Sequence, residues 1–146
     1  MNTIATTNTT NTSQSAVPAI GRLLLAAIFI FSGIGKAMAP AGTIGYIASA
    51  GLPFATLGLV AAIAIELGGG VMLALGIKAR IVALGLALFS VVTALAFHNA
   101  LGDQNQLIHF MKNIAMAGGL LQVVAFGAGA YSLDALGSRK RVAQAA

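Results

Sequence analysis

Hydrophobic residues in this 146-residue chain gather in four long runs, and polar residues gather in the segments between and around them. The runs cover residues 19–38, 54–77, 81–97 and 113–130. Each has roughly the 20 residues that a helix needs to cross the hydrocarbon core of a bilayer. Too few polar residues remain to surround four such helices in a soluble fold. The pattern therefore predicts an all-α integral membrane protein with four spans.

The segments outside the runs complete the predicted organisation. Short connections make consecutive helices antiparallel neighbours, so we expect a four-helix antiparallel bundle within residues 19–136. Residues 1–18 are rich in Asn, Thr and Ser and carry no charged side chain, which predicts a disordered N-terminal tail. Residues 137–146 form a basic C-terminal tail.

Composition supports this picture and excludes several functions. Hydrophobic residues make up 58% of the chain and charged residues 8%, against about 25% charged residues in soluble domains. Cysteine is absent, which excludes dithiol, disulfide and iron–sulfur chemistry by this chain alone. The net charge of +5 is scattered among apolar runs rather than gathered in a patch. We therefore expect the lipid bilayer, and not nucleic acid, as the partner.

The basic residues predict the orientation of the spans. More of them fall on the side of the two termini than on the other side, and Lys and Arg are enriched on the cytoplasmic side of membranes. Both termini are therefore predicted to be cytoplasmic. The terminal side holds Arg22, Lys78, Arg80, Arg139, Lys140 and Arg141, and the opposite side holds Lys36 and Lys112.

Glu66 is the most informative polar residue, because it falls in the middle of the second run, where an acidic side chain costs about 2.5 to 3.5 kcal/mol. Small residues on its helical face would let another helix approach closely. The first run supplies a cation: with Arg22 at the membrane edge, Lys36 lies only about 6 Å past the midplane. Ser32 shares the face of Lys36. We therefore predict a buried ion pair between Lys36 and Glu66.

Two alternatives remain open for this pair. In the first, Lys36 extends to the membrane surface and Glu66 is protonated. In the second, the pair forms but serves only to fix the register of two helices, rather than to contact a ligand.

Other polar residues lie near the ends of the third and fourth runs. His98, Asp103 and His109 are types that ligate metals, but their spacing matches no defined site, so no metal is predicted. Lys112 and Asn113 are interfacial, and Gln122 lies deep in the fourth run, where we expect it to bond to a neighbouring helix. No catalytic motif is present in the sequence, so no catalytic residue is predicted.

Several of these segments together resemble the DoxX family, and the resemblance covers residues 20–136. The segments that carry it are Gly21-Arg22, Ser32-Gly33-Ile34-Gly35-Lys36, Ala50-Gly51-Leu52-Pro53, Glu66-Leu67-Gly68-Gly69-Gly70, Gly76-Ile77-Lys78-Ala79-Arg80, His109-Phe110-Met111-Lys112-Asn113, Gly118-Gly119-Leu120-Leu121 and the stretch from Gly127 to Asp134.

The resemblance implies a multi-pass protein of the bacterial inner membrane. Relatives of this family are described as small subunits of quinol- or thiosulfate-oxidising complexes, as partners of soluble redox enzymes, or as assembly factors, so the resemblance implies one of these roles. The cysteine pairs of some redox-active relatives are missing here, so direct dithiol chemistry is not expected. The recurrent polar positions of the family correspond to Arg22, Lys36, Glu66, Arg80, Lys112, Asn113 and Asp134.

The sequence leads to one functional hypothesis and leaves two alternatives. The first is a redox-associated membrane subunit or partner that binds a quinone or similar lipophilic molecule through Lys36 and Glu66, and that has no independent catalytic activity. The alternatives are a non-enzymatic scaffold or assembly factor, and a small-solute transporter, which four short helices would need to oligomerise to form.

Overall fold

The computed structural model describes residues 15–145, and every regular element in that part of the chain is a helix. In chain order the elements are α1 (Val17–Met38), α2 (Pro40–Ser49), α3 (Ala55–Ile63), the π-helix η2 (Ala64–Gly68), α4 (Gly69–Leu75), α5 (Ala79–Phe97), α6 (Gln104–Phe126) and α7 (Leu133–Ala145). Since α3, η2 and α4 run on without a break, the described part contains four helices long and apolar enough to cross a membrane. The predicted all-α, four-span architecture is confirmed.

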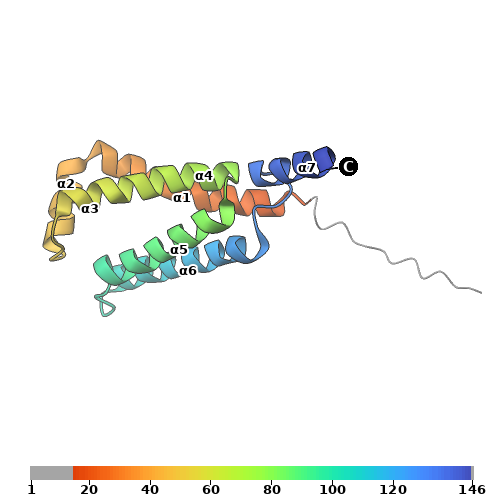
Figure 1. Cartoon of the computed structure of the whole chain (residues 1–146). Helices are drawn as coiled ribbons and strands as arrows, with labels where there is room; N and C mark the ends of the chain where they lie inside the picture. The colour runs from red at the N-terminus through yellow and green to blue at the C-terminus, as the bar shows by residue number, and fades with distance from the viewer. Residues whose placement is uncertain (1–14, 146) are drawn as a thin grey trace, which may run out of the picture.

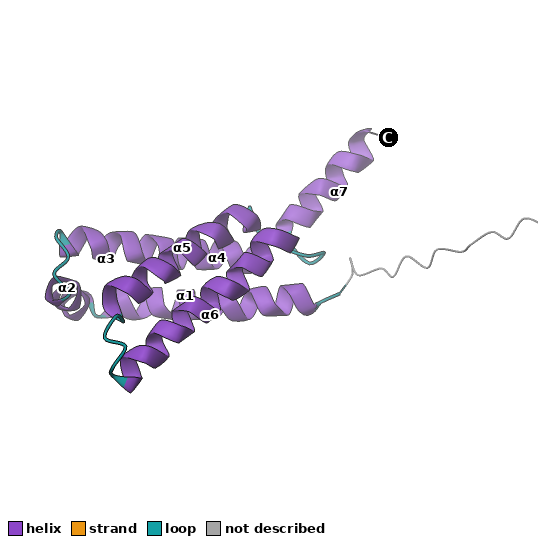
Figure 2. Ribbon diagram, turned by 90° about the horizontal axis from the view of Figure 1, so that it is seen from below, coloured by secondary structure: helices purple, strands orange, loops and turns teal. Residues whose placement is uncertain are grey.

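The four spans alternate in direction along the molecule (Figure 1). α1 packs against η2 and α4 to form one hairpin, and α5 packs against α6 to form the other. The hairpins meet where α4 contacts α5 and α1 contacts α6, and they diverge away from these contacts (Figure 2). We call the end with α7 and the start of α1 the terminal end, and the end with α2 the loop end.

Several helices begin or end at other residues than the hydrophobic runs predict. α6 begins at Gln104 rather than at residue 113, because the Asp103 carboxylate accepts a hydrogen bond from the Gln106 N–H and caps the helix. The connection before residue 54 contains α2, which Pro40 opens at its first turn. Most of the C-terminal tail is helical, as part of α7.

The predicted disordered tail falls mainly on residues 1–14, which lie outside the described residues, while Val17 and Pro18 belong to α1. The division into tail, membrane domain and tail stays a prediction. So does the cytoplasmic position of the termini, although both described ends of the chain lie at the same end of the bundle (Figure 1).

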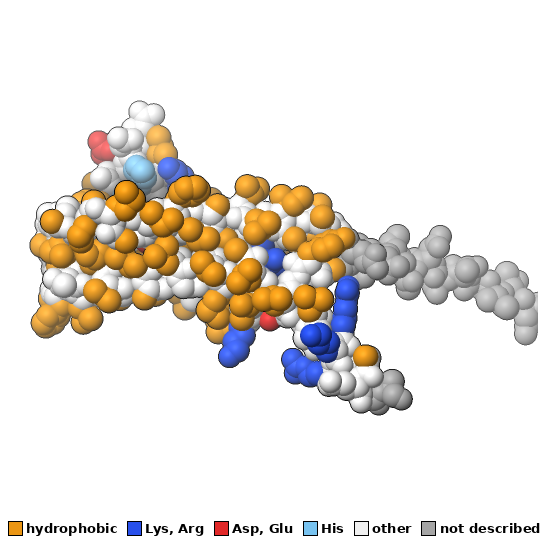
Figure 3. All heavy atoms as spheres, turned by 90° about the horizontal axis from the view of Figure 1, so that it is seen from above, with side chains coloured by type: hydrophobic (Ala, Val, Ile, Leu, Met, Phe, Trp, Pro, Cys, Tyr) orange, Lys and Arg blue, Asp and Glu red, His pale blue; other side chains and the backbone are white. Residues whose placement is uncertain are grey.

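The core of the bundle is narrow. It is built largely of alanine, with Phe29, Leu73, Leu86 and Leu120 as its large members. In the most apolar 18-residue stretch of each span, between 17% and 28% of the residues are buried, and the outer surface is covered with exposed Leu, Ile, Val and Phe side chains (Figure 3). In water this apolar surface would be unfavourable, but in a bilayer it contacts lipid.

Polar contacts tie the terminal end together. Asp134 accepts hydrogen bonds from the backbone N–H groups of Lys78 and Ala79, at 2.8 and 2.9 Å, and so caps α5 from the distant end of the chain. Arg22 on α1 donates to the carbonyl oxygens of Ala74 at 3.2 Å and Tyr131 at 2.9 Å, and to that of Ala128.

The turn after α4 requires a glycine. Gly76 has φ of +68°, and a Cβ added there would lie 2.5 Å from the Ser132 Cβ and 3.0 Å from the Arg22 Nη1. Only glycine combines this backbone conformation with so close an approach.

Candidate functional site

The backbone around Glu66 departs from regular α-helix. Residues 64–68 form a π-helix, whose wider turn inserts an extra residue into the span, and such turns occur frequently at functional sites. Glycines bring α1 close to this turn: a Cβ on Gly33 would lie 2.8 Å from the Leu67 side chain, and one on Gly70 would lie 2.8 Å from that of Ile30. Close helix packing therefore places the α1 side chains against Glu66.

Lys36, Ser32 and Glu66 form one hydrogen-bonded group. The Lys36 Nζ lies 2.9 Å from the Glu66 Oε1 and donates to the Ser32 Oγ at 2.7 Å. The Ser32 hydroxyl in turn donates to the same Glu66 Oε1 at 3.0 Å. The Glu66 side chain is 6% exposed and the Lys36 side chain 26% exposed, so the pair is largely desolvated. The structure thus brings together the two residues that the sequence singled out.

Both charged side chains of this group have atoms that could form further hydrogen bonds. An ammonium carries three donors, and Lys36 uses two of them here. The second carboxylate oxygen of Glu66, Oε2, is buried and has no hydrogen-bond partner among residues 15–145. A buried acceptor without a donor is unfavourable by about 1 to 3 kcal/mol. Both the ammonium and the carboxyl group can therefore take a further polar partner.

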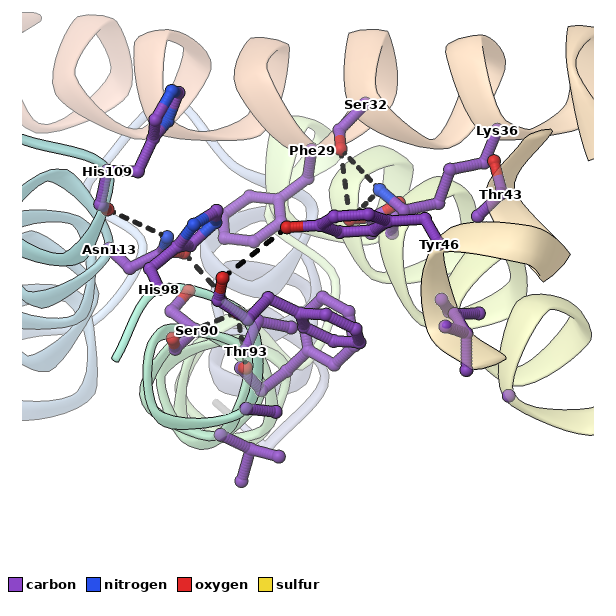
Figure 4. A pocket seen from close by; sticks show the side chains of 18 of the residues that line it. Phe29, Ser32, Lys36, Thr43, Tyr46, Ser90, Thr93, His98, His109 and Asn113 are labelled. Carbon is purple, nitrogen blue, oxygen red and sulfur yellow. Dashed lines mark hydrogen bonds and ion pairs between the residues drawn. The ribbon is translucent and has the colours of Figure 1, made fainter. Parts of the chain in front are cut away.

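A cavity of about 470 Å³ opens beside this group, between the two hairpins at the loop end (Figure 4). Its lining is mainly apolar and aromatic, with Phe29 from α1, Tyr46 from α2 and Phe89 from α5. Lys36, Ser32 and Glu66 lie on one wall. Ile28 and Val92, which also line the cavity, are 42% and 61% exposed, so its lining reaches the surface that faces lipid.

Polar side chains also stand on the opposite side of the cavity (Figure 4). The His98 Nδ1 lies 2.9 Å from the Gln106 Oε1, and the His98 ring stacks on His109 with ring centroids 5.0 Å apart. The Thr93 Oγ1 lies 3.3 Å from the Asn113 Oδ1, and the Asn113 amide donates to the His109 carbonyl. His98, His109, Asn113 and Lys112 all line the cavity.

The remaining candidate residues lie elsewhere. Arg22, Arg80 and Asp134 join helices at the terminal end, where the Arg80 Nη1 donates to the Val124 carbonyl at 3.2 Å. Gln122 does not bond between helices as expected: it is exposed on the outer face of α6, and no hydrogen bond from its side chain occurs in the described structure. The reason is the helical period, because Asn113, which faces the cavity, and Gln122 project to opposite sides of α6.

Sequence reasoning missed the contribution of α2 and α5 to the site. Thr43 and Tyr46 reach the cavity from α2, and the Tyr46 hydroxyl lies 3.4 Å from the Phe97 carbonyl. Ser90 and Thr93 reach it from α5. In both helices the polar residues are spaced three apart, which places them on one face and is the signal that could have found them.

The residues considered for a metal site have other roles. Asp103 caps α6, and the two histidines stack on each other. Within residues 15–145 no group of three or more His, Cys, Asp and Glu side chains is arranged to hold a metal ion.

Comparisons with known proteins confirm that the chain is related to the DoxX family. The sequence model of the DoxX family matches residues 17–99. Inner membrane protein YqjF of Escherichia coli is 38% identical over 121 residues, which cover 83% of this chain and 92% of that protein. Inner membrane protein YphA of the same organism is 33% identical over 120 residues, which cover 79% and 86%. No solved structure matches the chain significantly. The predicted inner-membrane localisation is confirmed by these relatives together with the four apolar helices.

Proposed function

The chain belongs to the DoxX family, and we propose that this inner membrane protein binds a quinone or a similar lipophilic ring compound in the cavity beside Lys36 and Glu66, as a subunit or partner of a redox system. The observation that carries the proposal is an apolar cavity of about 470 Å³ with an incompletely bonded ion pair on one wall. Small-molecule sites are typically clefts of ~300 to 1,000 Å³ with a few convergent polar groups.

The polar chemistry of the wall matches an oxygenated ring. The remaining N–H of the Lys36 ammonium can donate to a carbonyl oxygen. The Glu66 carboxylate can accept from a hydroxyl group, since Oε2 has no partner in the described structure. Ser32 holds both groups in place through its hydroxyl. A quinone presents the acceptor and the corresponding quinol the donor, so this wall suits both forms.

The apolar surroundings support a lipophilic ligand. Phe29 and Phe89 offer aromatic faces on which a flat ring can pack. Because Ile28 and Val92 connect the cavity lining with the lipid-facing surface, such a molecule could enter from the bilayer and leave its tail there. The redox chemistry would belong to the bound molecule, with the protein supplying position and electrostatics.

Mass analysis of an organic extract from the purified protein tests the proposal. We expect a quinone in near one-to-one ratio in the parent protein and at least tenfold less in Lys36→Met, because a hydrogen bond from a charged donor contributes about 1.5 to 3 kcal/mol. Gln122→Leu is the matched control: it also replaces a polar residue within a span by an apolar one, but outside the cavity, and should retain the quinone. Equal traces of quinone in all three proteins would contradict the proposal. An empty protein that co-purifies with a partner enzyme would instead support a scaffold.

A further inference from the structure

A second cavity, of about 600 Å³, lies at the terminal end of the bundle and takes no part in the proposed quinone site. It is bounded by the start of α1, the end of α4, the segment 130–132 and α7. Two arginines line it, Arg22 from α1 and Arg139 from α7. These come from opposite ends of the chain, so the cavity exists only because the fold brings the two ends together.

Arg22 is a buried cation without a salt-bridge partner in the described structure. The residue is 3% exposed, and the three hydrogen bonds of its guanidinium all go to neutral backbone carbonyls. Its Nε is buried and has no partner among the described residues. No carboxylate in the described structure forms a salt bridge with it: Lys36–Glu66 is the ion pair found there, and Asp134, whose charge acts on Arg22 from farther away, bonds through both oxygens to the backbone of α5. A buried charge without a directly bonded counter-charge is costly, so this site favours an anion.

Arg139 adds a second, accessible positive charge to the same cavity. It is exposed, and its side chain donates no hydrogen bond within residues 15–145. Lys and Arg side chains also gather around α7 in Figure 3. Arginine is the side chain best suited to phosphate, because its planar group presents several N–H donors at once. Two guanidinium groups on one cavity therefore point to a phosphate group as the anion.

The rest of the lining indicates that the phosphate belongs to a lipid. Leu23, Leu75, Leu133 and Leu136 line the cavity and are each about half exposed, between 47% and 51%. They form an apolar path from the two arginines to the outer surface of the bundle. Basic pockets between membrane helices are known to hold anionic lipid head groups. We propose that the terminal-end cavity binds an anionic phospholipid, with its phosphate between Arg22 and Arg139 and its acyl chains along these leucines.

The test measures phosphatidylglycerol bound to the purified full-length protein by native mass spectrometry, with phosphatidylcholine as the neutral comparison. Arg139→Gln is the test variant, because Arg22 also holds the fold and its replacement could unfold the protein. Arg141→Gln is the matched control: it removes the same charge from the same helix, but Arg141 does not line the cavity. Circular dichroism checks that both variants keep the helix content of the parent.

We expect phosphatidylglycerol to bind the parent and Arg141→Gln alike, about tenfold more weakly to Arg139→Gln, and phosphatidylcholine to bind weakly to all three. Equal losses in the two variants would overturn the proposal, since they would show a general charge effect of α7. Equal binding of the two lipids would also overturn it. If millimolar inorganic phosphate displaces phosphatidylglycerol from the parent, the site recognises a free anion and the lipid assignment is wrong.

Discussion

Replacing Lys36 and Glu66 by apolar residues, singly and together, measures how strongly the two charges depend on each other. At the 2.9 Å separation of the Lys36 Nζ and the Glu66 Oε1, Coulomb's law with an effective dielectric of ~20 gives an attraction of ~6 kcal/mol. Desolvation offsets much of this attraction, yet removal of one partner leaves the other charge buried, which costs about 3 to 5 kcal/mol.

The two single variants should differ in cost. Lys36→Met leaves the Glu66 carboxylate, which is 6% exposed, without its ion-pair partner, so we expect the free energy of unfolding to fall by about 3 kcal/mol. Glu66→Leu leaves the Lys36 ammonium without its partner, but this side chain is 26% exposed and can extend toward water, so we expect a smaller loss of about 2 kcal/mol. The double variant replaces the pair by apolar side chains and should lose about 1 kcal/mol or less.

Unfolding in mixed micelles of a mild and a denaturing detergent, followed by far-ultraviolet circular dichroism, provides the free energies, since the chain has no tryptophan to report by fluorescence. We expect a coupling free energy of at least ~2 kcal/mol. The control cycle combines Lys36→Met with Gln122→Leu, whose side chain is exposed on the far face of α6, and should be additive within about 0.5 kcal/mol. Additive effects of Lys36→Met and Glu66→Leu would refute the reasoning.

Three further predictions concern the terminal end and the orientation of the chain. Asp134→Ala should lower the unfolding free energy by about 1 to 2 kcal/mol in the same assay, because it removes both hydrogen bonds that cap α5, whereas Asp134→Asn keeps one acceptor oxygen and should lose less; equal losses would contradict the capping role. Gly76→Ala should cost more than about 1 kcal/mol, because it adds a Cβ at φ of +68° and 2.5 Å from a neighbouring side chain, and an unchanged midpoint would contradict this. Reporter fusions after Ala146 should show a cytoplasmic location and fusions at Gln104 a periplasmic one, and the reverse pattern would overturn the orientation.

The spans and the Lys36–Glu66 pair could be predicted from sequence because one large energetic effect determines each of them. An apolar run of about 20 residues has few soluble alternatives, and a mid-span Glu66 requires a partner at its own depth. The sequence also contains a signal for the start of α6, because Asp103 followed three residues later by Gln106 is typical of a helix N-terminus. The predicted start at residue 113 is too late because it follows the hydrophobic run alone.

The cavity could not be predicted in the same way, because it depends on how two hairpins diverge. The hairpins meet through close contacts such as Gly69 on α4 against Leu86 on α5 and Gly119 on α6 against Leu25 on α1, whose partners lie far apart in the sequence. For the same reason, the shared cavity of Arg22 and Arg139 could not be predicted, since the two residues come from opposite ends of the chain.

Photo-crosslinking with a lipophilic azidoquinone tests most directly whether the cavity beside Lys36 and Glu66 binds a quinone. Peptide mapping should place the label on cavity residues such as Phe89 and Met116, and excess unlabelled quinone should prevent it. The label should also be largely lost in Lys36→Met. Labelling of lipid-facing residues such as Phe126, which is 80% exposed, at the same level in the parent and in Lys36→Met would contradict the account.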